Sequence, residues 1–391
     1  MAGPLEGIVM VDMARMGPGP FCATILGDMG ADIIRIDQPG RGDLIPQEVQ
    51  TRDATASSMG RNARSIGLNL KDEKARDIFY TLIEKADIFQ EGFRPGVVKR
   101  LGLDYETVKE INPRLVYASI SGFGQDGPYK SWAGHDINYV STAGLLGMTG
   151  EKGGVPVYLG TVIADFAGGG MHTAIGILLA LFHRERSGKG QYVDVSMTDG
   201  VMALTANVIE QYLQTGVAPR RGETMLGGLF PFYHLYECKE GKWISIGNIE
   251  PWLWANFCRA IGREEFIEAQ FEMGPKREEI TKELQKIFKT KTMQEWVDIL
   301  GPANVCVGPV NDIEDVVTNP QINARHMIIE VDHPEKGKIK QVGHFIKLSD
   351  TPASVRCVTP TQGQHTKEIL TELGYSDDEI AEMRQNGVVS S

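Results

Sequence analysis

Two short segments of this chain carry side chains that could take up and release a proton. One is Gly134-His135-Asp136, in a turn between glycine-rich stretches. The other contains Asp165, where a strand-like apolar stretch changes into a long helical pattern. Histidine has an ordinary pKa close to neutral pH, and a carboxylate at a helix start is stabilised by the helix N-terminus. His135 and Asp165 are therefore candidate proton-transfer groups.

Each of these residues also has an ordinary structural explanation. A lone aspartate at a helix start is most often an N-cap, and a histidine followed by aspartate in a loop is most often a surface residue or part of a hydrogen-bonded turn. The run Gly168-Gly169-Gly170 favours the functional interpretation of Asp165, because glycines weaken a helix but let a ligand approach the bare backbone. We therefore expect a ligand to lie close to the chain beside Asp165.

Several basic residues could hold an anionic part of a ligand: Arg35, Arg41, Arg61, Arg64, Arg94, Lys99 and Arg100. Arg94-Pro95-Gly96 follows a strand pattern and opens a helical one, so a phosphate could use the helix N-terminus together with the guanidinium group. The charged runs at 71–74 and 336–340 are expected to be solvated surface. The Gly-Pro-Gly-Pro turn at 17–20 does not match G-x-G-x-x-G, so it gives no support for a nicotinamide cofactor. The sequence contains no P-loop, H-x-x-H or H-E-x-x-H pattern, so it does not favour a metal site.

The elements that would position these residues alternate between strand and helix. Residues 8–13 have a strand pattern, a Gly-Pro-Gly-Pro turn follows at 17–20, and a helix pattern at 21–29 leads to the next strand at 31–36. Further strand patterns lie at 65–70, 86–90, 115–120 and 191–196. Repeated β-α-β units are typical of a parallel sheet with right-handed crossovers, which predicts a doubly wound α/β domain. A helix at 163–185 is apolar on most faces and is expected to be central.

The composition changes after residue 214, which predicts a second domain. Residues 215–228 are rich in Gly, Arg and Pro and are expected to form a linker. Residues 229–325 contain a hairpin pattern at 236–246 and three amphipathic helices, which predicts a smaller α+β domain. Residues 326–391 return to strand patterns and end in a charged helix at 366–373.

The net charge and the spacing of the cysteines limit which partners and which cellular compartment we expect for the protein. Lys and Arg number 40 and Asp and Glu 51, giving a net charge of −11, which argues against non-specific nucleic-acid binding. The five cysteines are far apart and form no C-x-x-C pair, as in a protein with reduced thiols. The chain shows no signal peptide and no run of the roughly 20 apolar residues that a membrane span needs. We expect a cytoplasmic protein without nucleic-acid or membrane partners.

Eight segments, taken in this order, resemble the family III CoA-transferases and their α-methylacyl-CoA racemase branch. They are GPGPFCATILGDMGADIIRID, EGFRPGVVKRLGLDY, SGFGQDGPY, GHDINY, ADFAGGGM, MLGGLFPFY, IGNIEP and GPVNDIEDVV. The resemblance covers nearly the whole chain. It implies a Rossmann-like large domain built from both chain ends, a smaller middle domain, and an interlocked homodimer.

The racemase branch is favoured mainly by His135. Transferases of the family resemble this chain at Asp165, which in them forms a covalent acyl anhydride, but they usually carry another residue in place of His135. The segments ADFAGGG and MLGGLFPFY also match the racemase branch, and the transferase glycine loop is absent at Gly227-Gly228. The resemblance thus implies a racemase or epimerase of 2-substituted acyl-CoA thioesters.

The resemblance also implies residue roles for this reaction. One of His135 and Asp165 removes the α-proton of the thioester and the other returns a proton to the opposite face, through an enolate that backbone N–H groups near Asp165 and residues 168–170 could stabilise. Glu250 would orient His135 from the partner's small domain, although it could equally be an N-cap before Pro251. The remaining roles concern coenzyme A, which enters as part of the substrate and not as a permanent cofactor: the residues expected to bind it are Arg35, Arg94, Arg100 and Tyr139.

Two other functions remain open from the sequence. The first is a CoA-transferase that moves CoA between carboxylic acids, in which Asp165 is the nucleophile and His135 an accessory group. The second is a CoA-binding or interaction protein without catalysis, against which the presence of His135, Asp165 and Glu250 argues. Asp136 is expected to support the local structure or the protonation state of the histidine ring.

Overall fold

The computed structural model describes residues 3–39 and 53–390, which divide into two compact units. The first unit comprises Met1–Ala143, Gly160–Leu204 and Asn323–Ser391, and the second comprises Gly144–Leu159 and Thr205–Ile322. The chain therefore leaves the first unit twice. The excursion at 144–159 was not separated from the large domain by the sequence pattern.

The first unit is built on a sheet whose order, among the described residues, is β12-β3-β2-β1-β4-β5-β6. The strands are β1 (Val9–Asp12), β2 (Asp32–Asp37), β3 (Ala63–Leu68), β4 (Ile88–Glu91), β5 (Val116–Ser121), β6 (Tyr192–Ser196) and β12 (Val389–Ser390). All neighbouring pairs are parallel except β12 with β3. This confirms the predicted Rossmann-like α/β class, since 3-2-1-4-5-6 is the doubly wound order.

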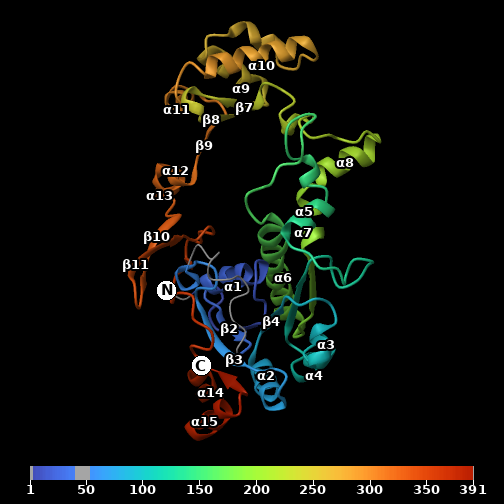
Figure 1. The fold of residues 1–391 in the computed structure, drawn as a ribbon, viewed down its shortest axis with the longest axis vertical. Helices are drawn as coiled ribbons and strands as arrows, with labels where there is room; N and C mark the ends of the chain where they lie inside the picture. Colours follow the sequence, from blue (N-terminus) through green and yellow to red (C-terminus); the bar gives the residue numbers. More distant parts are fainter. Residues whose placement is uncertain (1–2, 40–52, 391) are drawn as a thin grey trace. The chain divides into compact units, whose positions relative to one another are not determined.

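Helices cover both faces of this sheet (Figure 1). They are α1 (Pro18–Asp28), α2 (Glu73–Lys85), α3 (Val97–Leu101), α4 (Tyr105–Ile111), α5 (Asp136–Thr142), α6 (His172–Ser187), α7 (Met197–Leu204), α14 (Thr366–Glu372) and α15 (Asp377–Gln385). Successive strand residues point to opposite faces. Strand side chains on one face of the sheet, such as Met10, pack with α1 and α6. Those on the other face, such as Val11, pack with α2, α4, α14 and α15. The sheet is thus buried on both sides, as a parallel sheet requires.

The long helix predicted at 163–185 is present as Ala164–Ser187 and begins with a π-helical segment, η4 (Ala164–Met171). The helix was expected to be central because most of its faces are apolar, but within the single chain only part of it is covered, and Leu178, Leu179 and Phe182 are exposed. Among the described residues it is the one helix long and apolar enough to cross a membrane by length and composition, with a mean hydropathy of 1.4. Its buried face packs against β5 and β6, as that of a core helix does.

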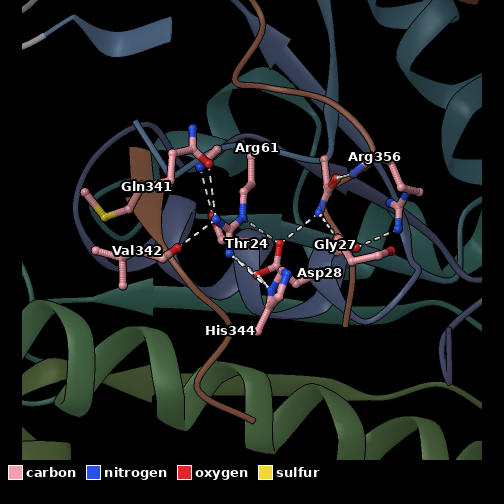
Figure 2. A network of polar contacts seen from close by, with 12 residues as sticks. Thr24, Gly27, Asp28, Arg61, Gln341, Val342, His344 and Arg356 are labelled. Atoms are coloured by element: carbon pink, nitrogen blue, oxygen red, sulfur yellow. Dashed lines mark hydrogen bonds and ion pairs between the residues drawn. The ribbon is translucent and has the colours of Figure 1, made fainter. Parts of the chain in front are cut away.

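A buried polar network holds the C-terminal part of the chain against α1 and β3 (Figure 2). Arg61, 2% exposed, donates to both carboxylate oxygens of Asp28 at 2.9 and 2.7 Å. The same guanidinium donates to the carbonyl of Val342 at 2.8 Å, and His344 Nδ1 lies 2.8 Å from Asp28 Oδ2. The hairpin of β10 (Ile328–His333) and β11 (Gly337–Val342) is tied to the core through these contacts.

The second unit has its own antiparallel sheet and core. Its sheet order is β7-β8-β9, with β7 (Tyr233–Glu237), β8 (Trp243–Gly247) and β9 (Val307–Val310). Its helices are α8 (Ala206–Thr215), α9 (Pro251–Ala260), α10 (Pro275–Phe288), α11 (Met293–Leu300) and α12 (Ile313–Thr318). The core is aromatic, with Phe232, Trp254 and Phe288 all fully buried. The chain returns to the first unit through α13 (Pro320–Ala324).

Candidate active site

A cavity of about 650 Å³ opens at the carboxyl ends of β1, β4 and β5, within the first unit. Its walls include residues 13–16 after β1, residues 92–95 after β4 and residues 120–123 at the end of β5. Neighbouring crossovers leave β1 and β4 in opposite directions, and ligands of open α/β sheets bind at such a switch point. His135, Tyr139 and Asp165 all line this cavity.

Asp165 is half-buried near the start of η4, at one side of the cavity. Burial, followed by the negative charge of Asp136, raises the pKa of its carboxyl group to about 6, although His135 opposes the shift. The carboxylate lies against the backbone of Gly17: a Cβ atom at Gly17 would lie 2.2 Å from Asp165 Oδ2. An aspartate with a pKa near 6 is partly protonated near neutral pH, so it can either donate or accept a proton.

His135 occupies the position before α5, and its backbone N–H donates to Asn138 Oδ1 at 3.0 Å. The residue is exposed in the single chain, but its charge influences the Asp165 carboxyl group. The neighbouring Asp136 is buried and accepts the backbone N–H of Asp165 at 3.0 Å. Asp136 therefore supports the local structure, one of the two roles expected for it, and joins the starts of α5 and η4.

Tyr139 contributes its ring to the cavity wall, and its hydroxyl group is already engaged. The hydroxyl donates to the Gly134 carbonyl at 2.5 Å, and the ring makes an edge contact with Phe123 at a centroid distance of 5.2 Å. A Cβ atom at Gly122 would lie 2.3 Å from the ring. Burial raises the pKa of the Tyr139 phenol. The ring can therefore pack against a ligand, but its hydroxyl group has a structural partner.

The glycines at 168–170 have a packing function that the sequence analysis did not anticipate. Cβ atoms at Gly168, Gly169 and Gly170 would lie 2.7–2.8 Å from Met197 or Pro18 atoms. All three are buried within η4, where α1 and α7 pack closely against it. The interpretation that these glycines leave backbone bare for a ligand is wrong; the glycine beside the carboxylate is Gly17.

The structure separates the candidate CoA-binding cations into two groups. Arg94 lines the large cavity, and Arg100 lines an adjoining cavity of about 310 Å³. Arg35 lines neither: its Nε lies 2.9 Å from Asp37 Oδ2 and its Nη2 donates to the Pro360 carbonyl. The guanidinium groups of Arg61 and Arg64 are held in ion pairs. Arg41 lies outside the described residues.

Glu250 belongs to the second unit, directly before α9. It occupies the N-cap position, yet its side chain makes no capping hydrogen bond. Its carboxylate is therefore not used to satisfy the start of its own helix.

Two buried carboxyl groups under the cavity were not identified from the sequence. Glu91, at the end of β4, accepts the Phe93 N–H at 2.8 Å and a hydrogen bond from Ser119. Asp12, at the end of β1, accepts the Ala14 N–H at 2.9 Å. Burial raises the pKa of Glu91 to about 7 and that of Asp12 to about 6. Both fix the loops that form the cavity wall, and the sequence signal for them was an acidic residue closing an apolar strand.

Comparison with known proteins finds relatives along nearly the entire chain. A family model described as CoA-transferase family III matches residues 5–366. The human alpha-methylacyl-CoA racemase is 35% identical, over 99% of this chain and 98% of that protein. The formyl-CoA:oxalate CoA-transferase of Afipia carboxidovorans is 33% identical, over 100% of this chain and 98% of that protein. A CAIB/BAIF family protein from Brucella suis superposes with a TM-score of 0.81 and 29% identity, covering 95% of this chain and 100% of that one.

Proposed function

Because this chain belongs to CoA-transferase family III, we propose that it is an enzyme that racemises 2-methyl-type acyl-CoA thioesters by moving their α-proton. The carbon between the thioester carbonyl and the 2-substituent would lie between His135 and Asp165. One of these groups would remove the α-proton, the thioester oxygen would carry the enolate charge, and the other group would return a proton to the opposite face.

The observation that carries this proposal is the shared cavity of His135 and Asp165, with the pKa of Asp165 raised to about 6. A carboxyl group that is a good general base has a pKa not far below the working pH. An ordinary surface aspartate, with a pKa near 3.8, would be a weaker base. Burial thus brings Asp165 closer in basicity to a histidine, which suits a pair that exchanges roles between the two directions of reaction.

Other residues would bind the substrate and complete the site. Arg94 and Arg100 are proposed to bind the nucleotide of coenzyme A, with the Tyr139 ring against the pantetheine arm. Arg35 could bind coenzyme A only if it gave up its contacts with Asp37 and the Pro360 carbonyl. Glu250 of the partner chain is proposed to orient His135. The reaction needs no resident cofactor, because the two side chains supply both base and acid.

We propose a cytoplasmic homodimer as the working form. Ile175, Leu178, Leu179 and Phe182 leave an exposed apolar face on α6, which a second copy of the chain would cover. The five cysteines are free thiols and three of them are buried, in keeping with a reducing compartment.

The alternative is a CoA-transferase in which Asp165 attacks the thioester and forms an acyl anhydride. It is supported by relatives with that activity at nearly the same identity as the racemase relatives. Close contact between Gly17 and the Asp165 carboxylate suits either role, because a nucleophile and a base both need a fixed position.

The deciding experiment is NMR of a chiral 2-methylacyl-CoA in D2O without an acceptor acid. Deuterium at the α-carbon with loss of chirality, both abolished in His135→Ala and Asp165→Ala, supports the racemase. Absence of exchange, followed by transfer of CoA to an added carboxylic acid, supports the transferase instead. Absence of both reactions across branched and dicarboxylic thioesters contradicts both proposals.

A further inference from the structure

Arg15 is a half-buried cation that lines both cavities, and the proposed reaction has no role for it. Its Nη1 is buried and has no hydrogen-bond partner among the described residues. Its side chain lines both the cavity that contains Asp165 and the adjoining cavity that contains Arg100. A guanidinium group has five N–H donors and no acceptor, and leaving one of its nitrogens buried without a partner costs free energy.

The two cavities are basic although the protein is acidic. Among the described residues their walls contain five Lys or Arg side chains and one carboxylate, that of Asp165. The five are Arg15, Lys71, Arg94, Arg100 and Lys130. The net charge of the whole chain is −11, so this local excess of cations is a property of the cavities. Such a region attracts an anionic ligand.

The position of Arg15 in the chain places it near the reacting end of the site. Arg15 precedes Gly17 by two residues, and the Gly17 backbone lies against the Asp165 carboxylate. Two residues span at most about 7 Å of extended chain. Arg15 is therefore attached to the chain within reach of the reacting centre, and it also lines the adjoining cavity.

We propose that Arg15 is a further substrate-binding residue, which holds an oxyanion group of the thioester where the two cavities meet. The oxyanion is either the pyrophosphate of coenzyme A or a carboxylate on the acyl group, since a guanidinium fork fits both. The pantetheine arm between them carries no charge. The assignment builds on the proposed function only in taking a CoA thioester as the ligand.

The test measures binding by calorimetry of the full chain, with probes that α-proton exchange would leave chemically unchanged. The probes are CoA, pantetheine, propionyl-pantetheine and succinyl-pantetheine, of which only CoA carries phosphates and only the last carries a carboxylate. The variants are Arg15→Gln, Arg15→Lys, and Arg384→Gln as a matched control. Arg384 is exposed on α15 and lines neither cavity.

If the phosphates are the partner, Arg15→Gln weakens CoA binding about 10- to 100-fold and leaves the three pantetheine probes unchanged. If an acyl carboxylate is the partner, the loss of affinity appears with succinyl-pantetheine and not with propionyl-pantetheine. Arg15→Lys, which keeps the charge but not the planar fork, shows a smaller loss of the same pattern. Arg384→Gln binds every probe like the wild type.

Unchanged affinity of Arg15→Gln for both CoA and succinyl-pantetheine overturns the assignment, as does an equal loss for the uncharged probes, which indicates a damaged cavity. Should Arg15→Gln not fold, Arg15→Lys decides the matter, because unchanged affinity for both anionic probes also overturns it. A wild-type protein that binds CoA but exchanges no α-proton contradicts the proposed reaction and leaves the role of Arg15 standing. If the wild-type protein binds neither CoA nor succinyl-pantetheine, the proposed anion-binding role of Arg15 is contradicted.

Discussion

The carboxylate of Asp136 accepts a hydrogen bond from the backbone N–H of Asp165, with 3.0 Å between Oδ2 and the nitrogen. This contact joins the segment that carries His135 to the one that carries Asp165. It also brings a second negative charge close to Asp165, which raises the pKa of that carboxyl group after the larger effect of burial. Position and basicity of the proposed base are therefore set partly by the same neighbour.

Asp136→Asn is expected to shift the acidic limb of α-proton exchange to lower pH. An asparagine oxygen can still accept the Asp165 N–H, but the charge that raises the pKa of Asp165 is lost. Asp165 acts as a base only when ionised, so the rate below about pH 6 should rise relative to the rate at pH 8. The measurement is the initial rate of deuterium incorporation from each enantiomer between pH 4.5 and 9. An unmoved acidic limb in both directions would show that Asp165 does not control it.

Glu91→Gln is expected to reduce the loss of stability as the pH rises. Glu91 is 1% exposed, and burial raises its pKa from 4.5 to about 7. A raised pKa means that the folded state binds the proton more tightly. The protonated Glu91 side chain therefore stabilises the folded state fully below pH 4.5, and this stabilisation is lost as the pH rises through 7. The resulting fall in the free energy of unfolding has a limit of the order of 3 kcal/mol.

Glutamine cannot ionise, and its amide can still pair with both Phe93 and Ser119. Urea unfolding at pH 5 and pH 8 should therefore show a smaller drop in unfolding free energy for Glu91→Gln than for the wild type. Glu84→Gln, an exposed change on α2, serves as the control and should follow the wild type. Equal drops for all three proteins would contradict a raised pKa at Glu91.

Arg61→Met is expected to lower the free energy of unfolding by about 3–5 kcal/mol, because it leaves the Asp28 carboxylate buried without its main partner. The comparison is Arg64→Met, whose partners Asp32, Glu368 and Glu372 are largely exposed and which should cost about 1 kcal/mol or less. Hydrogen exchange should quicken at residues 341–344 in Arg61→Met. Recovery of part of the stability in Asp28→Asn/Arg61→Met would identify the buried charge as the cause, and similar costs for both single variants would refute it.

Most of the first unit could be predicted from the sequence because its signals are local. Parallel strands buried on both faces give continuous apolar runs, and β1, β2, β4 and β5 lie within two residues of their predicted positions. Strand β9 and helix α15 were not predicted. The first has the short sequence Val307-Gly-Pro-Val310, whose glycine and proline are turn signals. Its strand conformation depends on pairing with β8, a contact distant in the sequence.

The candidate site was predictable in its residue types but not in its packing. His135 and Asp165 were identified as separate motifs, and the cavity that they share arises from the topology of the sheet. The triple glycine was assigned to ligand approach because sequence spacing does not show that Pro18 and Met197 pack on it. Arg35 was grouped with Arg94 by type, whereas its partner Asp37 lies two residues along the same strand and on the same face.

Glu250→Gln is expected to lower kcat while leaving the free energy of unfolding within about 0.5 kcal/mol of the wild type. Its side chain makes no capping hydrogen bond at α9, so neutralising it removes little from its own helix. The proposed role in orienting His135 predicts a changed pH profile of exchange as well. Glu268→Gln, an exposed change in the same unit, is the control and should keep the wild-type kcat. A loss of stability in Glu250→Gln with an unchanged pH profile would indicate a structural role only.

Gly17→Ala is expected to lower kcat about 10- to 100-fold, because the new Cβ atom would lie 2.2 Å from Asp165 Oδ2 and must displace the carboxylate. Gly17 also has a φ of 52°, so strain accompanies the clash. Gly7→Ala separates the two effects, since Gly7 has a φ of 84° but a Cβ atom added there would meet no heavy atom within 4 Å. Gly7→Ala should lose stability and keep its exchange rate per folded molecule. If Gly17→Ala retained full α-proton exchange, the carboxylate of Asp165 would not need its present position, and its role as base would be contradicted.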